Sequence, residues 1–419
     1  EHTLFVVSSK SGTTTETLDG FRYCWQQVST ITASPGMRFV AITDPGTPLE
    51  RLTQERHFRR VFPAPADVGG RYSALSVFGL LPAALIGVDV ERLLGTAQEM
   101  AEACGRHVRE PDNPALALGA ALGELALAGR DKVTFLTTPS LESFAYWVEQ
   151  LIAESTGKEG RGMIPVVGET PRQPGAYGPD RFFAQLLHRP EHTTTLDVQT
   201  SALRATALPF VSTWIDAKED LGGEFFRWEM AVAVAGAVIG IHPFDQPDVQ
   251  LAKDLARTAI AERDTAAEEE DTPVRVDDTE RIEREIRVWL SRPQPGDYVA
   301  VQAFLAPAPA TTILLQHIRH LLRDRLLLAT TSAYGPQFLH STGQLHKGGP
   351  NTGLFLQLID EPHDDLPVPE AGYTFGALIR AQAVGDYRAL LQRGRRILRV
   401  NLGADAAGGL GRLVEVLRR

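Results

Sequence analysis

The chain has 419 residues, of which 43% are hydrophobic and 22% are charged, as in a globular protein large enough for two or more domains. Its net charge of −10 argues against non-specific nucleic-acid binding, because no excess of basic side chains exists to neutralise phosphates. The longest apolar run, 230–241, is too short to span a bilayer and predicts a buried core helix. The two cysteines cannot form a disulfide framework or a zinc site, so we expect a reducing, cytoplasmic location.

Strand-like runs alternate with helical patterns along the chain. This alternation predicts an α/β protein with mainly parallel sheets that helices cover on both faces. We expect one domain at 1–112 and a second at 113–419, which contains an acidic, solvated loop near 262–280. The runs are T-L-F-V-V, R-F-V-A-I-T, K-V-T-F-L-T, M-I-P-V-V, F-V-S-T-W-I, Y-V-A-V-Q-A-F-L, L-F-L-Q-L-I and I-L-R-V-N-L.

The first of these runs leads directly into a segment rich in hydroxyl side chains, V-S-S-K-S-G-T-T-T-E-T at 7–17. The pattern predicts a turn that leads from a strand into a helix. A helix N-terminus offers unpaired N–H groups and a partial positive charge to an anion, and the hydroxyls could hold a phosphate without a metal. The alternative is an ordinary Ser/Thr helix cap.

A second candidate segment is D-V-G-G-R-Y-S at 67–73. Its two glycines would let the backbone approach a ligand closely, so that Arg71 could reach it. The alternative is a helix-initiating turn with a surface arginine.

Glu154 lies in Q-L-I-A-E-S-T-G-K-E-G-R-G, which follows an amphipathic helical pattern. A carboxylate at this helix end could serve as a general base whose pKa is tuned by burial. A carboxylate that faces solvent is the alternative.

The segment H-P-F-D-Q-P-D-V-Q-L-A-K-D places Gln246 and Lys253 seven residues apart, so we expect them to share one helix face. A lysine there could neutralise a developing oxyanion or contact a phosphate, although an exposed helical lysine is the commoner case.

His340 and His346 belong to F-L-H-S-T-G-Q-L-H-K-G-G-P-N, which we interpret as a polar, glycine-rich loop. A histidine that titrates near neutrality suits proton transfer. A metal role is less expected, because no matching carboxylate or cysteine spacing accompanies the two histidines.

Taken together, S-K-S-G-T-T-T-E-T, G-G-R-Y-S, A-E-S-T-G-K and F-D-Q-P-D-V-Q-L-A-K resemble the motifs of glucose-6-phosphate isomerases. The later motifs, above all A-E-S-T-G-K-E-G-R-G and L-H-S-T-G-Q-L-H-K-G-G-P-N, are most similar to the isomerase part of bifunctional transaldolase/phosphoglucose isomerases. The resemblance covers essentially the whole chain. It implies two SIS-type (sugar isomerase) α/β domains and interconversion of glucose 6-phosphate and fructose 6-phosphate through a cis-enediol, with no metal or nucleotide cofactor.

The resemblance also implies roles for individual residues. Arg71 would stabilise the enediolate, Glu154 would move the proton between C2 and C1, and His340 would open the sugar ring. Lys253 would complete the catalytic set. The substrate-binding residues would be Ser9, Lys10 through its backbone, Ser11, Thr14, Thr17, Gly70 and Gln246.

The chain departs from the family pattern in two respects. The family's order is base, histidine, lysine, whereas here the order is Glu154, Lys253, His340, so His188, His192 and His346 remain candidates for ring opening. The family's G-G-S loop does not precede Glu1, so we expect the first domain to be incomplete at its N-terminus. We therefore expect a piece of a longer protein, with a transaldolase domain upstream.

Three functions stay open at this point. The first is isomerisation of glucose 6-phosphate, the second is another SIS-type sugar-phosphate isomerase, and the third is a non-catalytic sugar-phosphate-binding module. Glu154 together with Arg71 favours catalysis, because a protein that only binds its ligand needs no base. The expected partners are a small sugar phosphate and, by resemblance, a second copy of the chain in a homodimer, with no nucleic acid and no membrane.

Overall fold

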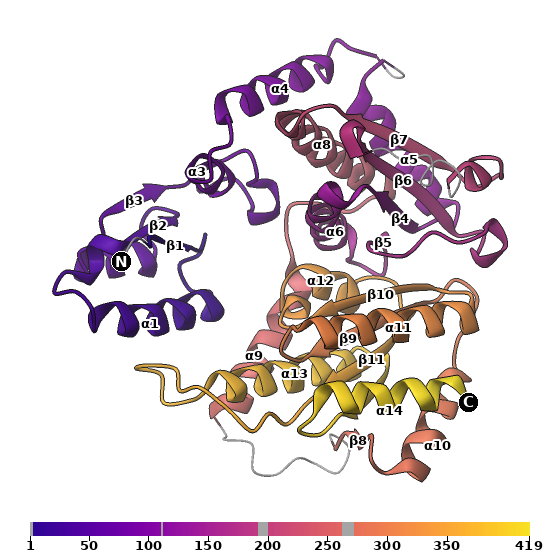
Figure 1. Ribbon diagram of the computed structural model, residues 1–419. Helices are drawn as coiled ribbons and strands as arrows, with labels where there is room; N and C mark the ends of the chain where they lie inside the picture. The colour runs from indigo at the N-terminus through magenta and orange to yellow at the C-terminus, as the bar shows by residue number, and fades with distance from the viewer. Residues whose placement is uncertain (1–2, 110–111, 192–199, 262–271) are drawn as a thin grey trace. The chain divides into compact units, whose positions relative to one another are not determined.

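The computed structural model describes residues 3–109, 112–191, 200–261 and 272–419 (Figure 1). The chain divides into two compact units, and each is described by itself. Unit 1 comprises Glu1–Pro114, Ala217–Glu229 and Leu366–Phe375, and unit 2 comprises Ala115–Asp216, Met230–Asp365 and Gly376–Arg419. The predicted fold class is confirmed, because the structure is α/β with parallel sheets flanked by helices. The predicted domain boundary near residue 112 stays a prediction.

Unit 1 contains a three-stranded parallel sheet in the order β1-β2-β3. Aromatic side chains of α1 pack on β2, and the rings of Phe21 and Phe39 meet edge to face with centroids 5.5 Å apart. Strand β1 pairs with β2 beside this packing, and the hydroxyl-rich segment leads from the end of β1 into α1. The elements are β1 (Phe5–Ser8), α1 (Thr15–Ser29), β2 (Phe39–Thr43), α2 (Pro48–Glu55), β3 (Arg60–Pro63), α3 (Val77–Leu85) and α4 (Val90–Ala103).

The first half of unit 2 holds a four-stranded parallel sheet in the order β5-β4-β6-β7. Helix α8 (Leu221–Ile239) contains most of the apolar run at 230–241, and its side chains Val232, Ala235 and Ile239 are buried, so the predicted core helix is confirmed. The remaining elements are α5 (Pro114–Leu127), β4 (Lys132–Thr137), α6 (Glu142–Thr156), β5 (Ile164–Val166), β6 (Arg181–His188) and β7 (Phe210–Ile215).

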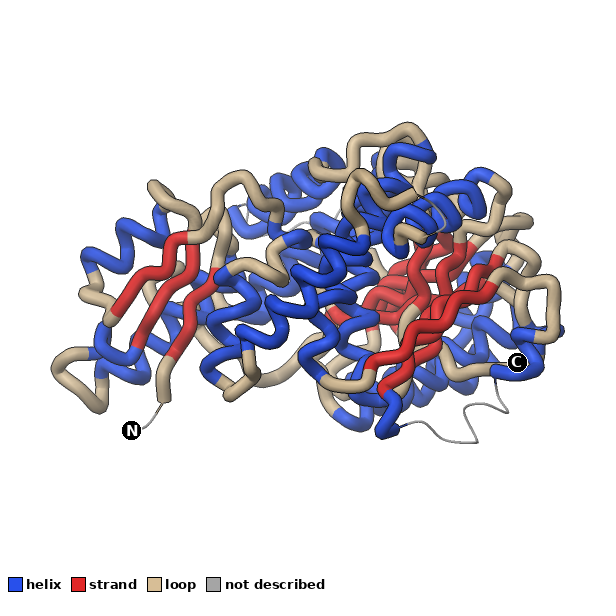
Figure 2. Tube along the Cα trace, turned by 90° about the horizontal axis from the view of Figure 1, so that it is seen from above, coloured by secondary structure: helices blue, strands red, loops and turns tan. Residues whose placement is uncertain are grey.

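The second half of unit 2 is a five-stranded parallel sheet in the order β10-β9-β11-β12-β8. Figure 2 shows strands in red with helices in blue around them. Helices α11 and α14 lie side by side along this sheet (Figure 1). The elements are α9 (Gln250–Ala261), β8 (Val274–Arg275), α10 (Thr279–Leu290), β9 (Tyr298–Phe304), α11 (Pro309–Leu326), β10 (Ala329–Tyr334), α12 (Ser341–Gly348), β11 (Gly353–Ile359), α13 (Phe375–Gln392), β12 (Arg396–Asn401) and α14 (Ala406–Arg418).

The predicted acidic loop near 262–280 falls partly outside the described residues, which omit 262–271. Its remainder is not all loop, because Val274–Arg275 forms β8 and pairs with β12, while α10 begins at Thr279. Asp278 caps that helix by accepting a hydrogen bond from the backbone N–H of Arg281 at 3.2 Å. In the part of the chain that the structure describes, no helix has the length and apolarity needed to cross a membrane.

Candidate functional site

The hydroxyl-rich segment forms a closed turn between β1 and α1. Thr14 occupies the N-cap position of α1, but its side chain makes no capping hydrogen bond. Instead, the Thr14 Oγ1 and Ser9 Oγ atoms lie 2.9 Å apart, while the hydroxyls of Ser11 and Thr13 pair at 2.8 Å. Gly12 has a φ of +65°, which an L-residue rarely adopts. The segment thus brings hydroxyls to a helix N-terminus that its own N-cap side chain does not satisfy, which suits an anion.

The side chain of Lys10 holds this turn against the rest of unit 1. Its ammonium group forms an ion pair with Asp44 and donates to the carbonyl of Ala66 at 2.9 Å. Ala66 belongs to the segment that leads into Gly70 and Arg71, so Lys10 connects the two predicted ligand-binding segments of unit 1. The Lys10 side chain therefore bonds to other residues of unit 1, and substrate binding by the Lys10 backbone stays a prediction.

Arg71 lies in a short 3₁₀ turn, Gly70–Tyr72, and only 4% of it is exposed. Its guanidinium group lies over the ring of Tyr72, 5.4 Å from the ring centre. The alternative of a surface arginine is therefore wrong, since Arg71 is buried. An arginine at such a position is costly to desolvate unless partners compensate its charge, which is consistent with a specific role.

In unit 2, two side chains bring three of the sequence motifs together. The buried Lys158 of E-S-T-G-K donates to the backbone carbonyls of His242 and Asp245 and to the Asp245 carboxylate, with distances of 2.7, 2.5 and 2.6 Å. Gln344 of H-S-T-G-Q donates to the carbonyl of Gly157 at 2.9 Å and to Asp248 at 2.8 Å. The segments 150–162, 242–254 and 338–351 thus form one cluster.

Glu154 lies in the last turn of α6, beside this cluster. Its side chain is half-buried and accepts a hydrogen bond from Nε2 of Gln150 at 3.1 Å. The carboxylate is thus held in place without being sealed from solvent, as a group that must exchange protons with a ligand requires.

Gln246 and Lys253 do not share one helix face, so that prediction is wrong. Gln246 is exposed and precedes a 3₁₀ turn, Pro247–Val249, whereas Lys253 lies half-buried within α9. Pro247 causes the difference, because it starts the tighter turn and the α-helix begins only at Gln250. Both residues nevertheless remain in the segment that Lys158 and Gln344 hold.

The segment 338–351 is largely helical, so the predicted polar loop is wrong. Residues Ser341–Gly348 form α12, and every residue of that helix is buried. His340 precedes the helix and is half-buried. His346 packs among aromatic rings, with Phe338 stacked on it at 5.9 Å and Gln302 Nε2 lying 3.2 Å from its Nδ1. Burial and the charges of Lys347 and Arg395 lower the pKa of His346 well below its ordinary value.

Of the other two candidate histidines, His188 lies within the described residues and His192 does not. His188 ends β6, and its Nδ1 lies 3.1 Å from Oε1 of Glu191 and 3.3 Å from Oγ of Ser140.

The predicted site residues are thus distributed over both units, and each group is described only within its own unit. Unit 1 carries Ser9, Lys10, Ser11, Thr14, Thr17, Gly70 and Arg71, and unit 2 carries Glu154, Gln246, Lys253 and His340. The roles assigned to these residues stay predictions. Within the described ranges, no three His, Cys, Asp or Glu side chains gather as metal ligands would.

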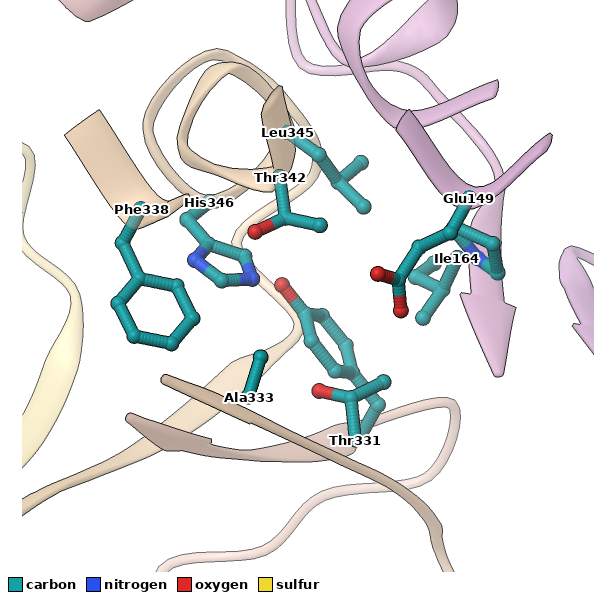
Figure 3. Close-up of a pocket in the computed structure, with 10 residues that line it drawn as sticks. Glu149, Ile164, Thr331, Ala333, Phe338, Thr342, Leu345 and His346 are labelled. Atoms are coloured by element: carbon teal, nitrogen blue, oxygen red, sulfur yellow. The ribbon is translucent and has the colours of Figure 1, made fainter. Parts of the chain in front are cut away.

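One notable residue, Glu149 of α6, was not predicted. It lines a small cavity of about 10 Å³, close to the space that one water needs, into which Thr342 and His346 also point (Figure 3). Burial raises the pKa of Glu149 to about 7, while a hydrogen bond from Gln337 and the charge of Arg319 oppose the rise. Nothing in the sequence indicated that Glu149 is buried beside a cavity, because an acidic residue in a helix is usually solvated.

Comparison with known proteins identifies relatives of this chain. A phosphoglucose isomerase family model matches residues 1–176. A probable glucose-6-phosphate isomerase of Haloarcula marismortui is 30% identical over 313 residues, which cover 66% of this chain and 71% of that protein. The glucose-6-phosphate isomerase of Rubrobacter xylanophilus is 31% identical over 294 residues, which cover 60% of this chain and 67% of that protein.

Solved structures show a similar fold. A glucose-6-phosphate isomerase from Chlamydia trachomatis superimposes with a TM-score of 0.50 at 20% identity, over 68% of this chain and 62% of that one. A hypothetical protein from Thermus thermophilus superimposes with a TM-score of 0.56 at 24% identity, over 62% of this chain and 72% of that one. At these identities the likeness concerns the fold alone.

Proposed function

The chain belongs to the glucose-6-phosphate isomerase family, and we propose that it interconverts glucose 6-phosphate and fructose 6-phosphate through a cis-enediol. The observation that carries the proposal is the cluster in unit 2, in which Lys158 and Gln344 gather three motifs around the end of α6. Glu154 lies at that helix end and is only half-buried, which is compatible with a base that meets a substrate.

In this proposal Glu154 removes the proton from C2 of the open-chain aldose and returns it to C1, while the O2 hydroxyl loses its proton and O1 gains one, which yields the ketose. One carboxylate can perform both transfers when they occur on the same face of a planar enediol. His340 assists ring opening by moving a proton to the ring oxygen, and Lys253 lies near the reacting carbons. Arg71 offsets the negative charge that develops on the enediolate oxygens.

The substrate phosphate is assigned to the turn between β1 and α1. Two hydrogen-bonded hydroxyl pairs and the N-terminus of a 15-residue helix support this assignment. A phosphate there would fix the substrate without participating in the proton transfer. The attached transaldolase domain and the homodimer stay predictions that rest on the resemblance.

A coupled assay of fructose 6-phosphate formation tests the proposed function. The variant Glu154→Gln preserves size and hydrogen bonding but cannot act as a base, so kcat should fall by about two to four orders of magnitude with little change in KM. Glu142→Gln, an exposed position at the start of the same helix, is the matched control and should retain wild-type turnover. Near-wild-type turnover by Glu154→Gln would exclude Glu154 as the base.

A further inference from the structure

Helix α6 contacts the turn before His340 through a part-buried hydrogen bond. Glu149 is only 5% exposed, and its Oε2 accepts from Nε2 of Gln337 at 3.1 Å. Gln337 opens a 3₁₀ turn, Gln337–Leu339, and the backbone N–H of His340 donates to the Gln337 carbonyl at 3.0 Å. Helix α6 thus carries the proposed base Glu154 and, through Glu149, is hydrogen-bonded to the turn that leads to His340.

The surroundings of Glu149 leave little freedom for this turn. Phe338 and Leu339 are each 2% exposed and pack with α9 and α13, which anchors these two residues of the turn in the core. The small cavity beside Glu149 is lined by Tyr298, Thr342 and His346, and Thr342 directly follows Ser341 at the start of α12 (Figure 3).

Charged and titratable groups face Glu149 from several elements. Arg319 of α11 is buried and contributes a positive charge, Tyr146 lies on α6 itself, and Tyr298 and His346 lie across the cavity. No carboxylate other than Glu149 lines the cavity among the described residues. A buried carboxyl group is costly unless it is hydrogen-bonded, so the bond from Gln337, together with the charge of Arg319, offsets part of the cost of burying Glu149.

We propose that Glu149 is a positioning residue, which acts through Gln337 to hold the turn that presents His340 to the substrate. The proposal rests on the proposed isomerase function and deepens it. It assigns Glu149 no contact with the substrate. Because proton transfer depends steeply on geometry, loosening the turn should slow ring opening and leave the later transfer by Glu154 intact.

A double-mutant cycle tests the proposal. Glu149→Ala and Gln337→Ala should each lower kcat on cyclic glucose 6-phosphate by about 10- to 100-fold with KM nearly unchanged. The double variant should be no slower than either single variant, since both remove the same bond. Glu149→Gln keeps an oxygen that can accept from Gln337 and should recover most of the activity. Glu142→Ala, exposed on the same helix, is the control.

Three outcomes would overturn the proposal. They are additive losses in the double variant, equal slowing of proton exchange on an open-chain substrate analogue, and a Glu149→Gln variant as slow as Glu149→Ala. Gln337 is only half-buried, so Gln337→Ala keeps the test informative if Glu149→Ala fails to fold.

Hydrogen exchange separates this proposal from the isomerase function. The amide protons of residues 338–345 should exchange faster in Gln337→Ala than in the wild type, with the core strands β9 and β11 unchanged. Unchanged exchange in that segment would contradict the positioning role even in an active enzyme. A wild-type chain without isomerase activity would contradict the proposed function, whatever the exchange shows.

Discussion

The ammonium group of Lys158 lies 2.6 Å from Oδ1 of Asp245, and this ion pair ties the end of helix α6 to the segment that enters α9. Lys158 is 2% exposed in its side chain, whereas Asp245 is 57% exposed. Desolvation raises the pKa of Asp245, but the hydrogen bond and charge of Lys158, with the charge of His242, outweigh it, so the pKa lies below its ordinary value. The main effect of the pair is therefore to give the buried ammonium group of Lys158 a counter-charge at the point where two motifs meet.

Replacing Lys158 should destabilise this junction. Lys158→Met keeps most of the apolar stem but leaves the carbonyls of His242 and Asp245 without their donor, so we expect the free energy of unfolding to fall by about 2 kcal/mol. Urea denaturation measures the loss. Lys218→Met, at an exposed lysine, should change stability by less than about 0.5 kcal/mol. Equal changes in the free energy of unfolding at the two positions would show that the contacts of Lys158 do not stabilise the fold.

The hydroxyl of Thr14 should contribute to binding rather than to folding. Its side chain makes no helix-capping bond but is hydrogen-bonded to the Ser9 hydroxyl, so Thr14→Val should lower the melting temperature only slightly. Loss of a hydrogen bond to a charged phosphate should raise KM for glucose 6-phosphate about tenfold, with kcat retained. Thr30→Val, at the other end of α1, is the control. An unchanged KM in Thr14→Val would place the phosphate elsewhere.

The buried carboxyl of Glu149 should make stability depend on pH. Its pKa is raised from 4.5 to about 7, so between these values the folded chain holds a proton that the unfolded chain has lost. The protonated Glu149 therefore contributes fully to the free energy of unfolding below about pH 4.5, and this contribution is lost as the pH rises through the folded-state pKa of about 7. Urea denaturation of wild type and Glu149→Gln from about pH 5 to about pH 8, a range that covers most of this loss, measures it. Parallel curves for the two proteins would contradict this prediction.

The sequence predicted the architecture well where apolar runs were continuous. Each of the runs named from the sequence overlaps a strand, and the strands pair in parallel as expected. Strand β6 was not predicted, although it is buried, because Arg181 and Gln185 interrupt its apolar character. Arg181 is accommodated by Glu169 and by Thr134, which lies 2.7 Å away, and such tertiary partners cannot be seen in the sequence.

The same limit explains the errors at the site. The residues of α12 look polar in sequence, yet Gln344 binds Gly157 and Asp248, and Lys347 pairs with Asp386 in the protein interior. Partners distant in sequence thus turned an expected loop into a buried helix. The motifs themselves were found because their residue types are unusual together, whereas Glu149 acquires its significance only from packing.

Incubation of the chain with glucose 6-phosphate in D₂O, with the sugars followed by NMR, shows directly whether the chain is an isomerase that uses Glu154 as its base. We predict that fructose 6-phosphate forms and that deuterium appears at C1 of the ketose and C2 of the aldose, because the proton held by Glu154 can exchange with solvent. Glu154→Gln should abolish both signals, while Glu142→Gln should preserve them. A folded wild-type chain that forms no fructose 6-phosphate, or a Glu154→Gln variant that incorporates deuterium at the wild-type rate, would contradict it.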